Sequence, residues 1–129
     1  MPAAFVVERD AVLRNMVRSV LTAQGFEIMD AATVAEAYAL FELLLNPPID
    51  LLILGHTPAA GEEPPPHRIL AEELLSRVPI MRVLVTSDCP YQVVAQENGI
   101  PQGGYFLQKP FTGVQLLNTV RNILEPSIQ

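Results

Sequence analysis

Cysteine and lysine are nearly absent from this sequence. Its 129 residues include one cysteine, Cys89, and one lysine, Lys109. A single cysteine excludes an internal disulfide framework and suits a reducing compartment, so we expect a cytoplasmic protein. The apolar runs fall well short of the roughly 18 residues needed to cross a bilayer, and the N-terminus turns polar too early for a secretory signal. We therefore expect no association with a membrane.

Positive charge is scarce as well. Eight arginine and lysine residues stand against 14 acidic ones, which gives a formal net charge of −6. Nucleic-acid binding usually needs a basic stripe that neutralises phosphates, so this composition argues against a nucleic-acid partner. Half of the residues are hydrophobic, and no internal repeat or boundary divides the chain. We therefore predict a single domain over residues 1–129, long enough to bury a core.

Short apolar runs alternate five times with segments of helical periodicity. The runs predict strands at residues 3–7, 26–31, 50–54, 80–87 and 105–108. The helices are expected to follow Asp10, to start at Thr33, to cover residues 68–77 and 90–98, and to end with one whose inner side carries Val114, Leu117, Val120, Ile123 and Leu124. Such a (βα)₅ alternation predicts an α/β fold with a parallel sheet covered by helices on both faces. Any site should then lie beyond the carboxyl ends of the strands.

Four fragments at these strand ends share their order with one protein family. They are VVERDAVLRNMV (residues 6–17), DLLILGHTP (50–58), VLVTS (83–87) and YFLQKPF (105–111). In this order the chain resembles the receiver domain of bacterial two-component response regulators over essentially its whole length. The resemblance implies a doubly wound, flavodoxin-like fold with a five-stranded parallel sheet in the order 2-1-3-4-5.

Receivers carry two acidic residues after the first strand, a phosphoacceptor Asp after the third, a Thr or Ser after the fourth and a Lys-Pro pair after the fifth. Glu8 matches the first acidic position, and Thr86 and Lys109 match the later ones. Arg9 reverses the charge of the second acidic position, and Gly55 stands where the acceptor would be.

These departures bear directly on the chemistry. Phosphoryl transfer to a receiver needs a carboxylate nucleophile and a divalent cation held by oxygen ligands. Glu8, Arg9, Gly55 and Lys109 together carry a charge of +1, so such a cation would be repelled. We therefore predict a degenerate pseudo-receiver with no metal, no cofactor and no enzymatic activity.

Arg9 is predicted to take the place of the cation. Its guanidinium would reach between the carboxylates of Glu8 and Asp10, with Lys109 joining this network. Asp10 is at the same time expected to cap the first helix through its N–H groups. His56 could in principle accept phosphate in place of Gly55, but alternation along the strand end turns it away from that position. It is interpreted as a solvated residue of a proline-rich loop over residues 55–67.

Two further positions follow from the resemblance. The peptide bond between Lys109 and Pro110 is expected to be cis, as at the matching position of receivers. Phe106 matches the aromatic position that receivers move together with the Thr when they switch, and here it is expected to be held in the core.

The C-terminal third has the character of an interaction surface. Receivers pair through the face made by the fourth helix, the fifth strand and the fifth helix. The charged residues after Cys89 are Glu97, Lys109, Arg121 and Glu125. Low charge together with Tyr91 and Tyr105 is compatible with an interface. We therefore predict a phosphorylation-independent module that binds a protein partner or a second copy of itself on this face.

Two alternatives remain open. A conventional phosphoacceptor with an atypical acceptor site, whose Asp lies at another position, would form a phosphoaspartate with acetyl phosphate and Mg²⁺. A flavodoxin-like binder of a small ligand would share the fold, although VVERDAV (residues 6–12) offers no glycine-rich phosphate loop after the first strand.

Overall fold

Five short apolar runs form the strands of one parallel sheet. A computed structural model describes residues 2–45, 47–56 and 64–125. The strands are β1 (Ala3–Val7), β2 (Glu27–Ala31), β3 (Leu51–His56), β4 (Arg82–Ser87) and β5 (Tyr105–Gln108). They pair in the order β2-β1-β3-β4-β5. The predicted fold class and strand order are confirmed.

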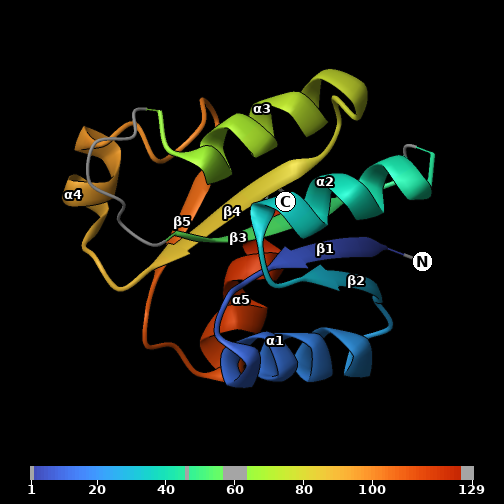
Figure 1. The fold of residues 1–129 in the computed structure, drawn as a ribbon. Coiled ribbons are helices and arrows are strands. Elements are labelled where there is room, and N and C mark those ends of the chain that lie inside the picture. Colours follow the sequence, from blue (N-terminus) through green and yellow to red (C-terminus); the bar gives the residue numbers. More distant parts are fainter. Residues whose placement is uncertain (1, 46, 57–63, 126–129) are drawn as a thin grey trace.

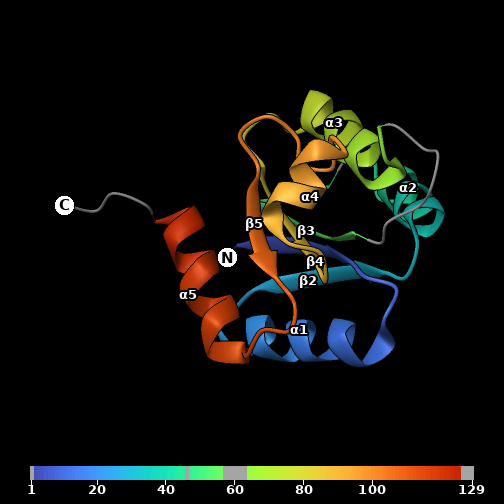
Figure 2. The same cartoon turned by 90° about the vertical axis from the view of Figure 1, so that its left-hand side faces the viewer.

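Helices cover both faces of the sheet, as parallel strands with crossover connections require. The helices are α1 (Ala11–Ala23), α2 (Val34–Leu43), α3 (Pro66–Arg77), α4 (Tyr91–Gln96) and α5 (Gly113–Leu124). Figures 1 and 2 show α1 and α5 on one face and α2, α3 and α4 on the other. Within the described ranges, none of these helices has both the length and the apolar character needed to cross a bilayer.

The central strands are buried on both sides because successive side chains point to opposite faces. On the α2–α4 side, Phe5, Leu52 and Leu54 belong to a core cluster that includes Phe41 of α2. On the α1–α5 side, Ile53 belongs to a second cluster with residues of α1 and α5. Two apolar layers therefore hold the sheet, and the strand ends emerge from them at fixed positions.

Short polar side chains define where the helices begin. The Asp10 carboxylate accepts hydrogen bonds from the N–H groups of Val12 and Leu13 at 2.9 and 3.2 Å, which confirms the predicted cap of α1. At α5, Thr112 and Gln115 form a reciprocal capping box. The segment after β1 therefore has two roles: Asp10 in it caps α1, and Glu8 in it belongs to the candidate site.

The structure corrects the predicted elements at several boundaries. β3 continues through Gly55 to His56, so both residues belong to a strand and not to a loop. β4 begins at Arg82, two residues later than predicted. Val114 is 68% exposed, because Leu116, Val120 and Ile123 form the buried side of α5. Residues 57–63 of the predicted loop lie outside the described residues.

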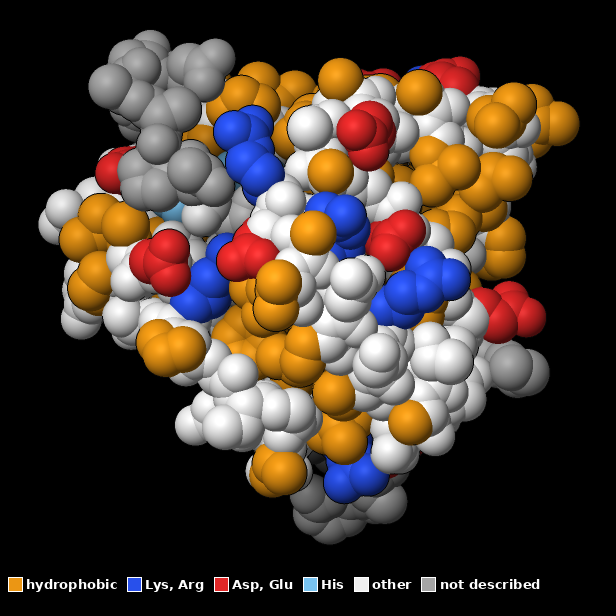
Figure 3. Space-filling view, turned by 60° about the horizontal axis from the view of Figure 1, so that its bottom comes forward, with side chains coloured by type: hydrophobic (Ala, Val, Ile, Leu, Met, Phe, Trp, Pro, Cys, Tyr) orange, Lys and Arg blue, Asp and Glu red, His pale blue; other side chains and the backbone are white. Residues whose placement is uncertain are grey.

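Charges of both signs are mixed on the side of the molecule that carries α1. Arg18 of α1 lies 3.3 Å from the carboxylate of Asp30, and Arg14 lies 4.0 Å from it. Figure 3 shows blue and red side chains next to one another on this side, with hydrophobic side chains between them. Neighbouring charges of opposite sign reduce the local field, so this face presents no continuous basic surface.

Candidate functional site

The carboxyl ends of the strands bring most of the predicted residues together. In the register of β3 and β4, Gly55 lies opposite Thr86. The Lys109 N–H donates to the Ser87 carbonyl at 2.8 Å, which holds the end of β5 beside the end of β4. Glu8 follows β1 directly and its N–H donates to the Ala31 carbonyl at 3.0 Å. Glu8, Gly55, Thr86 and Lys109 are thus positioned by the sheet itself.

Among the described residues, the buried carboxylate of Glu8 forms an ion pair with Lys109. Glu8 is 6% exposed. Its Oε2 accepts the Asp10 N–H at 2.9 Å. Its Oε1 lies 3.0 Å from Nζ of Lys109, and among the described residues this oxygen has no hydrogen bond. Burial of a carboxylate costs free energy unless it is paired, so Lys109 is what compensates this charge.

The Glu8 carboxylate fills the space beside Gly55. A Cβ atom placed on Gly55 would collide with Oε1 of Glu8 and would lie 2.8 Å from its Cδ. Glycine is therefore the residue that the position accepts while Glu8 keeps this orientation. The space that an acceptor side chain would need is taken by the carboxylate of Glu8, which directly follows the neighbouring strand β1.

The predicted role of Arg9 is wrong. Arg9 is exposed, and it makes no ion pair with any residue in the described ranges. The physical reason is the alternation of side chains at the end of β1, which turns Glu8 inward and Arg9 outward. The cation that pairs with the Glu8 carboxylate is Lys109, which follows β5.

A divalent cation, which the family resemblance implies, does not fit these residues. One Glu8 oxygen binds a backbone N–H, the other faces Lys109, and Asp10 is engaged as the cap of α1. Within the part of the chain that is described, no group of three or more His, Cys, Asp or Glu side chains is arranged to hold a metal ion. Hard cations need several oxygen ligands in one place, and the described residues at this site offer only the carboxylates of Glu8 and Asp10, each of which already has a partner.

His56 is buried, so its interpretation as a solvated residue is wrong. It is 3% exposed. Its Nδ1 lies 3.1 Å from Oγ of Ser87, and its Nε2 lies 3.3 Å from Oε1 of Glu97. The alternation argument placed it correctly on the face opposite to Gly55, together with Leu52 and Leu54. The environment differs because α3 and α4 cover that face.

His67 of α3 packs against His56, and sequence reasoning missed it. The two ring centroids are 4.7 Å apart, in an edge-to-face arrangement. His67 Nε2 lies 2.7 Å from the Gly99 carbonyl. Burial lowers the pKa of His67 to about 4, although the Gly99 carbonyl acts in the opposite direction. Burial also lowers the pKa of His56, against the effect of Glu97.

The hydrogen bonds indicate which nitrogen of His56 carries its proton. Glu97 can only accept, so Nε2 of neutral His56 carries the hydrogen and donates to that carboxylate. Nδ1 then accepts from the Ser87 hydroxyl, and the Ser87 oxygen in turn accepts the Cys89 N–H at 3.0 Å. This chain of bonds connects β3, β4 and the end of α4, and both rings are neutral at pH 7.

The two remaining predicted positions lie at β5. The peptide bond between Lys109 and Pro110 is cis, as predicted. Phe106 is partly buried and packs against the core on the α2–α4 side. Its ring contacts Tyr91 of α4 edge to face, with centroids 5.7 Å apart. Phe106 thus joins β5 to an exposed aromatic residue of α4.

The chain was compared with protein families, curated proteins and solved structures. No family model matches the chain, and no curated protein matches its sequence. Solved structures do match. The chemotaxis protein CheY4 of Vibrio cholerae has a TM-score of 0.77 at 22% identity, over 96% of this chain and 99% of that one. A response regulator of Thermotoga maritima has a TM-score of 0.76 at 24% identity, over 97% and 98%.

A CheY-like receiver domain protein of Methanospirillum hungatei has a TM-score of 0.77 at 19% identity, over 98% of this chain and 95% of that one. At such identities a likeness in structure defines the fold and leaves the activity open. The chain therefore has the fold of response regulator receiver domains, over nearly its whole length.

Proposed function

We propose that this chain is a pseudo-receiver, which takes no phosphate and acts by binding another protein or a second copy of itself. The observation that carries the proposal is the position of Glu8. Its carboxylate lies against Gly55, in the space of an acceptor side chain, and is paired with Lys109. Phosphoryl transfer needs an accessible nucleophile and, in this fold family, a divalent cation. Neither requirement is met by these residues.

This proposal includes the absence of catalysis. Among the described residues at the strand ends, Ser87 and His56 are hydrogen-bonded to each other, but Ser87 is 0% exposed and His56 is 3% exposed. A nucleophile that no substrate can reach does no chemistry, so this pair supports structure. The single cysteine and the small domain fit a cytoplasmic signalling protein, which is the setting that we propose.

A face for binding is available on α4, β5 and α5. Its exposed large apolar side chains are Tyr91, Val93, Tyr105 and Val114. Charged residues are sparse there, and interfaces are commonly depleted of charge and enriched in tyrosine. Phe106 and Tyr91 connect this face to the core, so a bound partner would rest on an ordered surface.

The phosphate part of the proposal is tested with acetyl phosphate and MgCl₂. Intact-mass spectrometry should detect no phosphorylated species of the full chain, whereas a conventional receiver treated in parallel should acquire one. A Mg²⁺ titration followed by NMR should leave the amide resonances of Glu8, Gly55 and Lys109 unchanged. A phosphorylated aspartate or glutamate in this chain would overturn the proposal.

The binding part is tested with three matched substitutions. Val93→Glu on α4 and Val114→Glu on α5 place a charge on the proposed face, and Val12→Glu makes the same change at an exposed valine of α1. We expect the wild type and Val12→Glu to form the same dimer or complex in analytical ultracentrifugation and affinity capture, and the other two variants to lose it. A wild-type chain that stays monomeric and captures no protein contradicts this part, as does equal loss in all three variants.

A further inference from the structure

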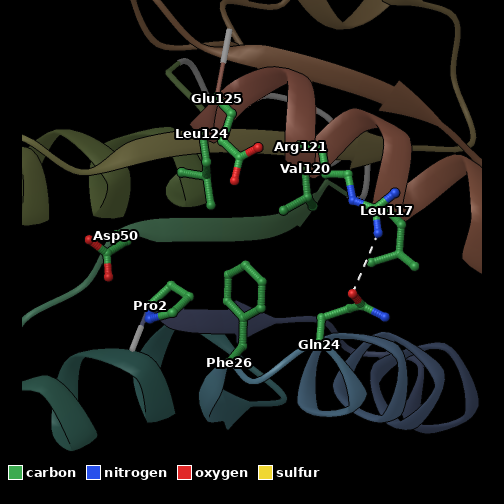
Figure 4. Close-up of a pocket in the computed structure, with 9 residues that line it drawn as sticks. All are labelled: Pro2, Gln24, Phe26, Asp50, Leu117, Val120, Arg121, Leu124 and Glu125. Atoms are coloured by element: carbon green, nitrogen blue, oxygen red, sulfur yellow. Dashed lines mark hydrogen bonds between the residues drawn. The ribbon is translucent and has the colours of Figure 1, made fainter. Parts of the chain in front are cut away.

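A cavity lies at the edge of the sheet where the strands begin, opposite to the site around Glu8. Its volume is about 360 Å³, which falls within the roughly 300 to 1,000 Å³ typical of small-ligand sites. Pro2, Phe26 and Asp50 precede β1, β2 and β3 on one side, and the last turns of α5 close the other side. Figure 4 shows these residues around the cavity.

The middle of the cavity is apolar. Figure 4 shows the Phe26 ring between Pro2 and Gln24, facing Val120 and Leu124 of α5 across the open space. Phe26 and Leu124 are only partly buried, although both pack against the α1–α5 core. Apolar surface is thus left accessible at this position, which favours a ligand with an apolar body.

Two carboxylates flank this apolar surface. Oδ2 of Asp50 accepts the Ala3 N–H at 2.8 Å, which holds that side chain at the start of β3. Glu125 follows α5 as its C-cap residue, and Figure 4 shows its carboxylate on the cavity side of the helix end. Carboxylates beside an aromatic ring form the usual chemical environment for an ammonium group.

The charge balance of the lining also favours a cation. Among the described residues that line the cavity, Arg121 is the one cation, and its Nη2 donates to Oε1 of Gln24 at 3.5 Å, away from Asp50. Asp50, Glu125 and Arg121 together carry a charge of −1. α5 ends at the same place, and the free carbonyl groups of a helix C-terminus add negative partial charge.

We propose that this cavity binds a small organic cation with an apolar body. The ammonium group lies between Asp50 and Glu125, and the apolar body rests on Phe26 and Leu124. The site is independent of the proposed pseudo-receiver function, because it shares no residue with the site around Glu8 and Lys109.

The test is an NMR titration of the full ¹⁵N-labelled chain at neutral pH. The probe is 2-phenylethylamine, and its uncharged counterpart is 2-phenylethanol. We expect the amine to shift the amide resonances of residues 24–26, 50 and 117–125 in a saturable way, with an affinity about tenfold above that of the alcohol. Equal affinity for both probes, saturation at other residues, or no saturable shift with the amine would each overturn the proposal.

Three substitutions locate the charge that is recognised. Asp50→Asn keeps an oxygen that can accept the Ala3 N–H, and Glu125→Gln changes an exposed residue, so both variants should fold. Each should weaken binding of the amine about fivefold and leave the alcohol unaffected. Glu27→Gln removes the same charge from an exposed residue outside the lining. It should leave the affinity unchanged, and a loss equal to that of Glu125→Gln would overturn the assignment.

Discussion

At the scale of single residues, Gly55 and Glu8 act as one unit. The substitution Gly55→Asp restores the residue type of an acceptor, yet we expect it to destabilise the protein by about 2 kcal/mol. The new Cβ would collide with Oε1 of Glu8, and a second carboxylate would add repulsion in a buried space. Urea unfolding measures the loss, and intact-mass analysis should still detect no phosphorylation.

Two further variants separate the causes of this effect. Gly55→Ala introduces the collision without the charge and should show part of the loss. The double variant Glu8→Ala with Gly55→Asp clears the space and gives Lys109 a carboxylate partner again, so it should be more stable than Gly55→Asp alone. If Gly55→Asp unfolds at the same urea concentration as the wild type, the packing of Glu8 against Gly55 does not limit which residue position 55 can accept.

Lys109 and Arg9 are expected to contribute very differently to stability. Lys109→Ala leaves the buried Glu8 carboxylate without its partner and should cost about 3 kcal/mol. Arg9→Ala changes an exposed side chain that forms no ion pair in the described ranges, and it should cost less than about 0.5 kcal/mol. Urea denaturation of both variants provides the comparison. A larger loss for Arg9→Ala than for Lys109→Ala would restore the hypothesis that the guanidinium fills the cation position.

These residue contacts mark the limit of what the sequence predicts. The residues at the strand ends could be named, because periodicity and spacing define where strands stop. The partner of each side chain could not, since it depends on rotamers and on the space left by neighbours. Glu8 faces Lys109 because Gly55 has no side chain, and no local pattern in the sequence contains that relation.

At the scale of elements, the first turn of α1 is defined by its cap. Asp10→Ala removes the acceptor for the N–H groups of Val12 and Leu13 and should destabilise the protein by about 1 kcal/mol. Asp10→Asn keeps an acceptor and should stay within a few tenths of a kcal/mol of the wild type. Thermal unfolding with and without Mg²⁺ distinguishes capping from metal binding. A Mg²⁺-dependent loss in both variants would contradict the capping role.

The sequence pattern predicted which segments form helices and strands, but it predicted the first and last residues of these elements less well. Alternating apolar runs predicted all five strands, and the family resemblance implied their order in the sheet; β1 and β5 match their predicted bounds. β3 extends past Gly55 because the backbone keeps pairing with β4, which sequence patterns alone do not reveal where a glycine interrupts the apolar run. This extension places His56 under α3 and α4, which bury it, whereas the sequence pattern predicted a solvated residue.

At the scale of the whole molecule, fold and site respond to different constraints. The fold depends on many apolar positions, so it persists when single site residues change, and its match to receivers at 19 to 24% identity reflects this. The site depends on a few positions, and at two of them, Arg9 and Gly55, the residue differs from the receiver pattern. Function therefore has to be argued from the site and tested on it.

Stability of the whole molecule is expected to fall in mild acid. The pKa of His67 is about 4 in the folded chain against 6.5 unfolded, and that of His56 is lowered as well. Because the unfolded chain binds protons more readily, stability is fully present above pH 6.5 and declines as pH falls toward 4. The His67 difference alone corresponds to about 3 kcal/mol.

Two measurements isolate the histidines from the carboxylates that titrate at lower pH. The chain has two histidines, so their ring C–H resonances can be followed separately by NMR. The His67 signal should stay unprotonated down to about pH 5. Urea unfolding between pH 7 and pH 4.5 should show a smaller decline for His67→Asn than for the wild type, because the substituted side chain cannot take up a proton. Titration of the His67 ring near pH 6.5 would mean that α3 does not bury it, and the contact that joins His67 to His56 and Gly99 would then be absent in solution.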